Sequence, residues 1–312
     1  MNTCVLSYVL ITPARNEEAF LEETIHSVMS QTVLPKKWVI VSDGSTDRTD
    51  DIAKKYLTIC SWIELVRMPE RRDRNFAAKV RCFNAGAKRV QDEAFDIIGN
   101  LDADVTFGSG YFEYLLSKFV ADAQLGVAGT PFVEGDSAYD YRFTPTEHVS
   151  GACQLFRREC FNQIGGYVQV KGGGIDWIAV TTARMKGWRT QTFLDHCCYH
   201  HRPMGTASVG RLRSNFRLGQ QDYYLGGHPL WQFSRACYQM TRWPYLVGGL
   251  GLFAGYVWGW LIGLERPVSA DLVRFHQREQ IDRLMRLFNP IRVVRKRKAE
   301  VDLARSQNHA QL

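Results

Sequence analysis

The sequence lacks the features that mark several common classes of protein. Its eight cysteines form no C-x-x-C pair and follow no regular spacing, which argues against a disulfide framework or a zinc site and favours free thiols in a reducing compartment. Neither an internal repeat nor a low-complexity segment is present. The short apolar run Val5–Ile11 has no basic leader and continues into charged residues, which does not fit a signal peptide. We therefore expect the chain to work on the cytoplasmic side.

Glycine-rich phosphate loops are also missing. The polar segments Thr12–Glu18 and Asp43–Asp47 follow the first two predicted strands and contain no such loop, which disfavours a Rossmann dinucleotide site, a P-loop or a sugar-phosphate nucleotidyltransferase. The net charge of +7 gathers beyond residue 205, but no recognised nucleic-acid-binding module accompanies it. We expect an anionic partner other than nucleic acid for this part of the chain.

The first two hundred residues alternate between predicted strands and helices. Short apolar runs end in polar turns and lead into segments with one apolar face, which predicts an α/β fold with a mostly parallel sheet. In such a sheet the polar residues beyond parallel strands meet at one edge, where ligands bind. The predicted strands are Val5–Thr12, Trp38–Ser42, Ile63–Val66, Phe95–Leu101, Leu125–Gly129, Gly151–Phe156 and Thr190–Leu194.

Two carboxylates, Asp102 and Asp104, follow the strand predicted at Phe95–Leu101. Side chains two residues apart in an extended segment point the same way, so both can reach one cation. Mg²⁺ or Mn²⁺ is the cation expected there, with substrate phosphates completing its ligands. For the pair alone, the alternative is two aspartates in a solvated turn.

Two further aspartates stand next to predicted loops. Asp43 ends the second strand and could accept the ring N–H of a nucleobase, although turn and cap chemistry is the alternative. Asp176 follows the glycines Gly172–Gly174, which let the backbone approach a ligand closely, and it stands at a predicted helix start. Taken alone, this local pattern favours an N-cap aspartate behind a flexible loop.

Several short motifs occur in one order within residues 5–200. They are V-L-I-T-P-A-R-N-E-E, S-x-x-x-Q-T at Ser27–Thr32, V-S-D-G-S-T-D, N-A-G at Asn84–Gly86, and L-D-A-D. This series resembles the family 2 glycosyltransferases, which are inverting enzymes of the GT-A fold. The resemblance implies that Asp102 faces the ribose and phosphates and that Asp104 binds the metal. It also implies a nucleotide pocket lined by Pro13, Arg15, Glu17 and Asp43.

The same resemblance assigns two roles nearer the C-terminus. Asp176 would be the catalytic base, although Ile175 stands where the family has a glutamate. A histidine after the strand predicted at Thr190–Leu194 would be a third metal ligand. His201 is the first choice for this ligand and His200 is the alternative.

The last third of the chain has a different character. Gln239, Arg242 and Trp243 match the Q-x-x-R-W signature of processive polysaccharide synthases, in which the Arg and Trp sit near the acceptor and the donor phosphates. The stronger interpretation is that Arg242 and Trp243 anchor an interfacial helix. The uncharged run Tyr245–Leu264 has several possible placements: it could span hydrocarbon, re-enter, lie at the interface or pack on protein.

A basic, amphipathic segment follows Pro267. Apolar positions alternate with arginines there, and a basic cluster comes next at Arg292 and Arg295–Lys298. Beside an apolar segment, this pattern indicates binding to an anionic cytoplasmic leaflet, while a packed helix with a solvated basic tail is the alternative.

We therefore predict a GT-A α/β catalytic domain over residues 1–205. A helical, hydrophobic and basic region for membrane association and acceptor binding is predicted over residues 206–300, and a polar tail over residues 301–312. The predicted enzyme is an inverting glycosyltransferase at the cytoplasmic face of the membrane. It would use a nucleoside-diphosphate sugar, with the UDP type favoured, and a lipid-linked saccharide or polysaccharide precursor as acceptor. The alternatives are a non-catalytic, membrane-anchored scaffold with a relic nucleotide site and a sugar-phosphate nucleotidyltransferase.

Overall fold

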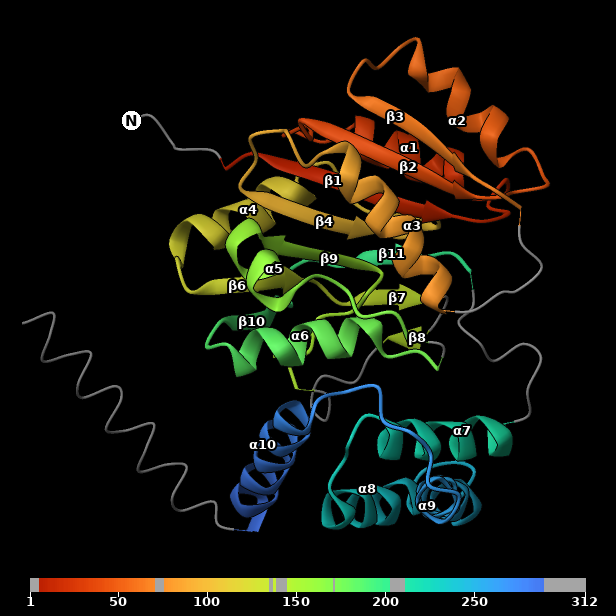
Figure 1. Ribbon diagram of the computed structural model, residues 1–312, viewed down its shortest axis with the longest axis vertical. Coiled ribbons are helices and arrows are strands. Elements are labelled where there is room, and N and C mark those ends of the chain that lie inside the picture. Colours follow the sequence, from red (N-terminus) through yellow and green to blue (C-terminus); the bar gives the residue numbers. More distant parts are fainter. Residues whose placement is uncertain are drawn as a thin grey trace, which may run out of the picture. The chain divides into compact units, whose positions relative to one another are not determined.

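The computed structural model describes residues 6–70, 76–134, 137–138, 145–170, 172–202 and 211–288. The chain divides into two compact units, Met1–Ser208 and Val209–Leu312. The first unit contains two β-sheets, and the described part of the second unit is helical (Figure 1).

A seven-stranded sheet forms the centre of the first unit. Its strands are β1 (Tyr8–Ala14), β2 (Lys37–Asp43), β3 (Ile63–Met68), β4 (Ile97–Leu101), β6 (Leu125–Gly129), β9 (Cys153–Arg157) and β10 (Arg189–Thr192). They lie in the order β10-β6-β9-β4-β1-β2-β3, and all neighbours are parallel except that β9 runs antiparallel to β4 and β6. The predicted α/β fold with a mostly parallel sheet is confirmed. The direction of β9 could not be predicted, because hydrophobic patterning is the same in both directions.

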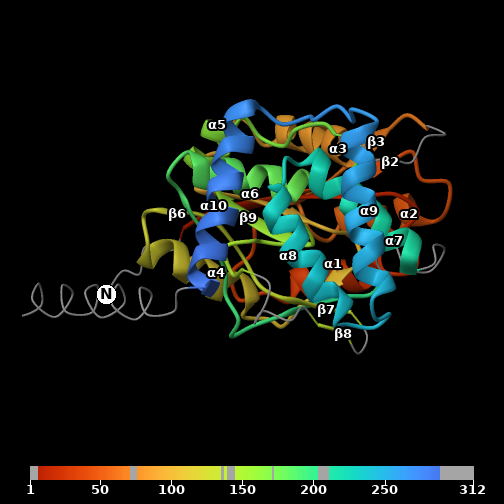
Figure 2. The same ribbon diagram turned by 90° about the horizontal axis from the view of Figure 1, so that it is seen from below.

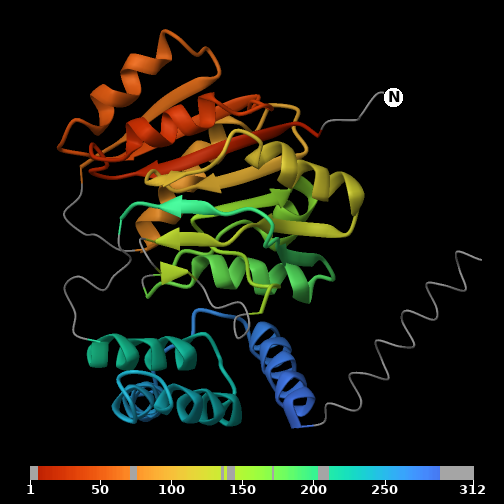
Figure 3. The same cartoon turned by 180° about the vertical axis from the view of Figure 1, so that it is seen from behind.

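Helices cover both faces of this sheet. The described helices of the unit are α1 (Leu21–Met29), α2 (Thr49–Leu57), α3 (Phe76–Arg89), α4 (Tyr111–Ala121), α5 (Arg158–Ile164) and α6 (Ile175–Met185). The face with α3 and α5 is toward the viewer in Figure 1, and the face with α1 and α4 is toward the viewer in Figure 3. Because β1, β2 and β4 are parallel, their carboxyl ends meet along one edge of the sheet.

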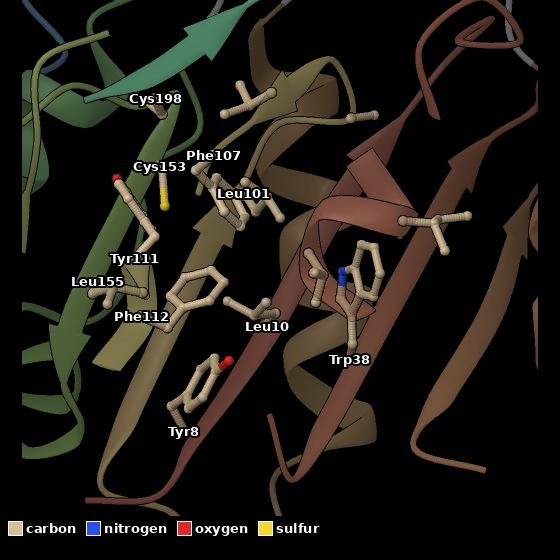
Figure 4. Packing of buried hydrophobic residues seen from close by; sticks show 14 of the residues in the cluster. Tyr8, Leu10, Trp38, Leu101, Phe107, Tyr111, Phe112, Cys153, Leu155 and Cys198 are labelled. Carbon is tan, nitrogen blue, oxygen red and sulfur yellow. The ribbon is translucent and has the colours of Figure 1, made fainter. Parts of the chain in front are cut away.

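The core beside β1, β2 and β4 is large and aromatic (Figure 4). Tyr8, Trp38 and Phe112 are fully buried, and the rings of Tyr8 and Phe112 are centred 4.9 Å apart. The indole Nε1 of Trp38 donates to Oγ1 of Thr12 at 2.9 Å, so a buried hydrogen bond also joins β2 to β1. Each such side chain stabilises the fold by about 1.5–3 kcal/mol through burial. The packed core therefore fixes the positions of the strand ends that carry the polar residues.

A second, smaller sheet joins segments far apart in the sequence. Its strands are β5 (Val105–Thr106), β7 (Phe132–Glu134), β8 (Ser137–Ala138) and β11 (Cys198–His200), in the order β5-β11-β7-β8. The sequence pattern predicts only loops in these places, because each strand is too short to show the alternation of apolar and polar residues that marks a strand. β11 runs antiparallel to β5 with His200 opposite Val105, which brings the histidine next to the acidic turn after β4.

The second unit is described from α7 to α10. Its helices are α7 (Arg211–Tyr224), α8 (Pro229–Met240), α9 (Val247–Leu261) and α10 (Ala270–Phe288). α9 packs against both α7 and α8, and α10 packs against α8 (Figure 2). A Cβ atom on Gly255 would lie 1.9 Å from the carbonyl oxygen of Phe216, and one on Gly219 would lie 1.9 Å from that of Leu252. Glycine is therefore required where α7 and α9 touch.

The segment predicted as a possible membrane span forms α9, a helix of 15 residues. Among the helices in the described part of the chain, none combines the length and the apolar character needed to cross a bilayer. The basic cluster at Arg292 and Arg295–Lys298 and the predicted tail over 301–312 lie outside the described residues.

Candidate functional site

Asp102 and Asp104 lie directly beyond the end of β4. The backbone N–H of Asp102 donates to the carbonyl of Ala152 at 2.9 Å, so the pairing of β4 with its neighbour continues past the strand. Asp104 is only 6% exposed. Burial, and then the negative charge of Asp102, raise the pKa of the Asp104 carboxyl above its usual value. Two carboxylates held together in a buried place are unfavourable unless a cation or a proton offsets their charge.

His200 completes a set of three candidate metal ligands. Ligand atoms of Asp102, Asp104 and His200 all lie within 4.8 Å of one another. The Nε2 atom of His200 is 3.5 Å from Oδ1 of Asp104, and the buried Nδ1 atom of His200 has no hydrogen-bond partner within the described residues. Carboxylate oxygens and an imidazole nitrogen are suitable ligands for a divalent cation. The residues present therefore fit the predicted metal.

The neighbouring His201 faces elsewhere. Its Nε2 atom lies 2.8 Å from Oγ1 of Thr106, and its ring stacks on that of Phe20 with centroids 6.1 Å apart. Successive side chains of an extended segment point to opposite sides, so only one of two adjacent histidines can face the acids. The geometry favours His200, the alternative from the sequence, over His201, the first choice.

Lys79 is a site residue that the sequence analysis did not identify. It stands on α3, and its Nζ atom lies 2.5 Å from Oδ1 of Asp102. The available signal was its place in the helix just before the N-A-G motif, and a lysine on a helix is more often solvated. The pair leaves a cationic group beside the acids, where a phosphate would also be attracted.

Arg15 and Asp43 meet where β1 and β2 end. Nη1 of Arg15 lies 3.5 Å from Oδ2 of Asp43, and Asp43 is buried. Pro13, a further predicted pocket residue, lies on β1, is half-buried and pairs with Val41 of β2. The structure therefore brings together three of the residues predicted to contact a nucleotide.

Glu17, the fourth predicted nucleotide contact, is held by a cation from a distant segment. Nη2 of Arg202 donates to Oε2 of Glu17 at 2.6 Å and to the carbonyl of Asn16 at 3.0 Å. The N–H of Glu17 donates to Oγ1 of Thr49 at 2.8 Å. Arg202 was not identified from the sequence, because its partner lies on the first loop of the chain. Glu17 thus joins the first loop to two other segments.

Asp176 lines a cavity that also contains Asp102 and Lys79. The cavity has a volume of about 160 Å³ and lies over the end of β4. Asp176 is the second residue of α6, so the N-cap position predicted as an alternative for it is occupied by Gly174. Its Oδ2 atom accepts the N–H of Gly151 at 3.2 Å. The full lining is Lys79, Val80, Phe83, Asn100, Asp102, Ser150, Gly151, Ala152, Tyr167, Gly174, Ile175, Asp176 and His200.

The predicted pair Arg242 and Trp243 belongs to the second unit, between α8 and α9. The Nε atom of Arg242 donates to the hydroxyl of Tyr238 at 3.0 Å, and its guanidinium lies over the Tyr238 ring. Trp243 is 62% exposed. The role of this pair toward acceptor or diphosphate stays a prediction.

Comparison with protein families and curated proteins gives a consistent result. The family model described as glycosyl transferase family 2 matches residues 9–171. The chain is 26% identical over 199 residues to a 4,4'-diaponeurosporenoate glycosyltransferase of Staphylococcus aureus, covering 57% of this chain and 51% of that protein. It is 27% identical over 136 residues to a poly-beta-1,6-N-acetyl-D-glucosamine synthase of the same species, covering 43% of this chain and 31% of that protein. The chain therefore spans about half or less of these relatives.

Solved structures with a similar fold include two complexes with nucleotide sugars. A mannosyltransferase of Pyrobaculum calidifontis in complex with GDP-Man and Mn²⁺ superposes with a TM-score of 0.55 at 18% identity, covering 93% of this chain and 83% of that one. S. aureus TarS in complex with UDP-GlcNAc superposes with a TM-score of 0.52 at 15% identity, covering 69% of this chain and 65% of that one. At these identities the likeness establishes the fold alone.

Proposed function

Because the chain belongs to glycosyl transferase family 2, we propose that it transfers a sugar from a nucleoside-diphosphate sugar to an acceptor hydroxyl, with inversion at the anomeric carbon. The observation that carries this proposal is a single cavity lined both by candidate metal ligands and by Asp176, a possible base. Asp102 and His200, two of the candidate metal ligands, line it together with Asp176. A leaving diphosphate and an attacking hydroxyl need these two groups on either side of the reacting carbon.

Asp102, Asp104 and His200 would hold the divalent cation, Mg²⁺ or Mn²⁺. When bound, such a cation offsets the charge that builds on a leaving diphosphate. The geometry supports this assignment, because ligand atoms of the three residues all lie within 4.8 Å of one another and two of the three residues are buried. Lys79 would supply a fixed positive charge beside the same phosphates.

Asp176 would act as the general base. It takes the proton of the acceptor hydroxyl while that oxygen forms a bond to the anomeric carbon. The bond from this carbon to the phosphate oxygen breaks, and its electron pair leaves with the nucleoside diphosphate. Attack from the side opposite the leaving group inverts the anomeric configuration. The presence of Asp176 in the same cavity as Asp102 supports this role.

We propose a uridine nucleotide as the favoured donor. The buried carboxylate of Asp43 can accept the imide N–H of uracil, and Arg15, whose Nη1 atom lies 3.5 Å away, pairs with that carboxylate and holds it in place. Guanine also offers a ring N–H, so GDP sugars belong in the same test. The relatives with N-acetyl-D-glucosamine in their names lend support to UDP-GlcNAc as the first donor to try.

We propose a lipid-linked saccharide as acceptor, brought to the enzyme by a membrane surface that the second unit binds. α9 buries its glycines against α7 and α8 and leaves bulky side chains outside. Aromatic residues at both of its ends are typical of a helix lying at a membrane interface. Exposed apolar side chains of this unit include Leu230, Phe233, Trp243, Tyr245, Leu246, Val247, Leu250, Trp258, Trp260, Leu261 and Ile262.

Release of nucleoside diphosphate tests the proposed reaction directly. The protein is incubated with UDP-GlcNAc, UDP-glucose or GDP-mannose in the presence of Mn²⁺, with and without a membrane lipid extract as acceptor source. We expect slow release from one donor by hydrolysis, faster release with the extract, and loss of both in excess chelator. No binding and no release with any donor would contradict the proposal.

A further inference from the structure

We propose that Asn100 is a positioning residue that orients Asp176 through the backbone of Gly151. The inference rests on the proposed function, since it concerns the base of that reaction. Ile175 precedes Asp176, so a carboxylate at that position cannot hold the base. The structure assigns this task to groups on β4 and on the chain that leads into β9.

Two hydrogen bonds meet on Gly151. The Nδ2 atom of Asn100 donates to the carbonyl of Gly151 at 2.7 Å. The N–H of Gly151 donates to Oδ2 of Asp176 at 3.2 Å. The two backbone groups lie in the peptide planes on either side of the Cα atom of Gly151, so the hydrogen bond from Asn100 helps to hold in place the residue whose N–H reaches Asp176. The orientation of the carboxylate then depends on a residue of β4.

The segment around Gly151 is anchored at further points. The N–H of Ala152 donates to Oγ of Ser150 at 3.3 Å, and the carbonyl of Ala152 accepts the N–H of Asp102 at 2.9 Å. Asn100 itself is 2% exposed and stands on the rigid central strand β4. A buried carbonyl that loses its donor costs about 1–3 kcal/mol, so Gly151 would move or rotate to find another.

Gly151 also touches the base directly. A Cβ atom added to Gly151 would lie 3.1 Å from Cβ of Asp176 and 3.4 Å from its Oδ2. These distances are tighter than ordinary contact, so even a methyl group would require Asp176 to shift. The base is therefore held by a hydrogen bond and by close packing against the same residue.

Asn100 is linked by hydrogen bonds to both proposed reacting groups of the cavity. Its Nδ2 atom is 3.5 Å from Oδ1 of Asp102, which faces the proposed leaving group, while Gly151 links it to Asp176. Loss of the Asn100 side chain would let Gly151 and Asp176 shift. Such a shift reduces turnover strongly, because the reacting atoms must be held within a fraction of an ångström. A residue that only positions the base affects turnover more than donor binding.

The test compares Asn100→Ala and Gly151→Ala with the control Gln31→Ala. Gln31 is also a buried carboxamide, and its Nε2 atom donates to the carbonyl of Gly108 at 2.8 Å, in a loop that does not line the cavity. Each variant is assayed for kcat and for the donor KM with whichever of UDP-GlcNAc, UDP-glucose and GDP-mannose the wild type turns over fastest. Thermal unfolding is measured alongside.

We expect kcat to fall by about 10-fold or more in Asn100→Ala and Gly151→Ala while the donor KM changes by less than about 3-fold. Gln31→Ala should lower the unfolding temperature but leave kcat within about 2-fold of the wild type. If Asn100→Ala fails to fold, Gly151→Ala still tests the contact between Gly151 and Asp176, on which the inference depends.

Unchanged kcat in folded Asn100→Ala or Gly151→Ala would overturn the inference. A raised donor KM with unchanged kcat would also overturn it, because Asn100 would then contact the donor rather than position the base. In both cases the wild type still turns over a nucleotide sugar, and the proposed function stands. A wild type that releases no nucleoside diphosphate from any of the three donors would overturn both.

Discussion

The Nζ atom of Lys79 lies 2.5 Å from Oδ1 of Asp102. The pair joins α3 to the acidic turn after β4 at the edge of the sheet where parallel strands end. A lysine there reduces the negative charge of the acids and presents a cation to incoming phosphates. We therefore expect it to contact the donor phosphates as well as Asp102.

Replacing Lys79 with methionine should weaken donor binding. The substitution removes the charge and keeps most of the length, so the donor KM should rise by about 10-fold, equivalent to about 1.4 kcal/mol. Lys54→Met is the matched control, because Lys54 pairs with Asp51 at 3.1 Å on the exposed surface of α2. Steady-state kinetics with the preferred nucleotide sugar checks both. Equal KM values for the two variants would argue against a phosphate contact.

The two adjacent histidines provide a paired test of the metal site. His200→Ala should reduce the Mn²⁺-dependent binding of UDP or GDP by about 10–100-fold, because a ligand near Asp104 is lost. His201→Ala should leave it nearly unchanged, because His201 contacts Thr106 instead. Calorimetric titration with and without Mn²⁺ measures the difference. A larger loss of Mn²⁺-dependent nucleotide binding in His201→Ala than in His200→Ala would indicate that His201 is the metal ligand, as the sequence first suggested.

Asp176→Asn should separate binding from turnover. Asparagine keeps the shape of the side chain but cannot take a proton, so kcat should fall by about 100-fold or more while donor binding stays close to that of the wild type. Asp271→Asn is the control, since Asp271 is likewise the second residue of a helix. Near-normal turnover in Asp176→Asn would leave Asp176 with a structural role only.

Asp47 links the two loops that border the predicted nucleotide pocket, and its contribution should depend on pH. Its Oδ2 atom accepts the N–H of Glu18 at 3.0 Å, and its Oδ1 atom accepts the N–H of Thr49 at 3.0 Å. Partial burial raises the pKa of Asp47, but the hydrogen bonds from Thr49 and Glu18 outweigh it and lower the pKa below 3.8. The charged form therefore stabilises the fold above the unfolded-state pKa, and this stabilisation is lost as the pH falls through the folded-state value.

Asp47→Asn should lower the free energy of unfolding by about 1 kcal/mol at neutral pH, because the amide cannot accept the N–H of Glu18. The difference from the wild type should shrink below about pH 3.8. Urea denaturation at neutral pH and near pH 3.5 measures it. A difference that is the same at both values would mean that the charge of Asp47 does not matter.

Local patterns predict the central sheet well, because each buried strand is a continuous apolar run that ends in polar residues. The same reasoning places Asp102, Asp104 and Asp43 at one edge, since parallel strands leave no other place for them. It cannot choose between His200 and His201, because that choice depends on β11, a strand of three residues formed only by pairing with β5 and β7. Contacts made across the fold, such as those of Lys79 and Arg202, join residues far apart in the sequence, so local patterns do not predict them.

The exposed aromatic side chains of α9 should bind the full chain to lipid vesicles. Trp258 and Trp260 are 50% and 64% exposed, and removing both with Trp258→Ser and Trp260→Ser should weaken binding by about 10-fold or more, since burying one such side chain contributes about 1.5–3 kcal/mol. Ile59→Ser with Leu194→Ser is the control, because these residues are 67% and 54% exposed on the first unit. Sedimentation with phosphatidylcholine–phosphatidylglycerol vesicles measures the partition.

The basic cluster should contribute to the same binding in a different way. Reversing Arg295, Lys296, Arg297 and Lys298 to Glu should weaken binding at low salt, where each basic residue near an anionic surface contributes about 1 kcal/mol, and should matter little at about 1 M salt. The variant with Trp258→Ser and Trp260→Ser should bind the vesicles equally weakly at low salt and at high salt, because burial of apolar surface is not screened by salt. If the full chain does not bind anionic vesicles at low salt, the exposed apolar side chains of α9 would instead contact a protein partner. The proposal of a lipid-linked acceptor would then lose its main support.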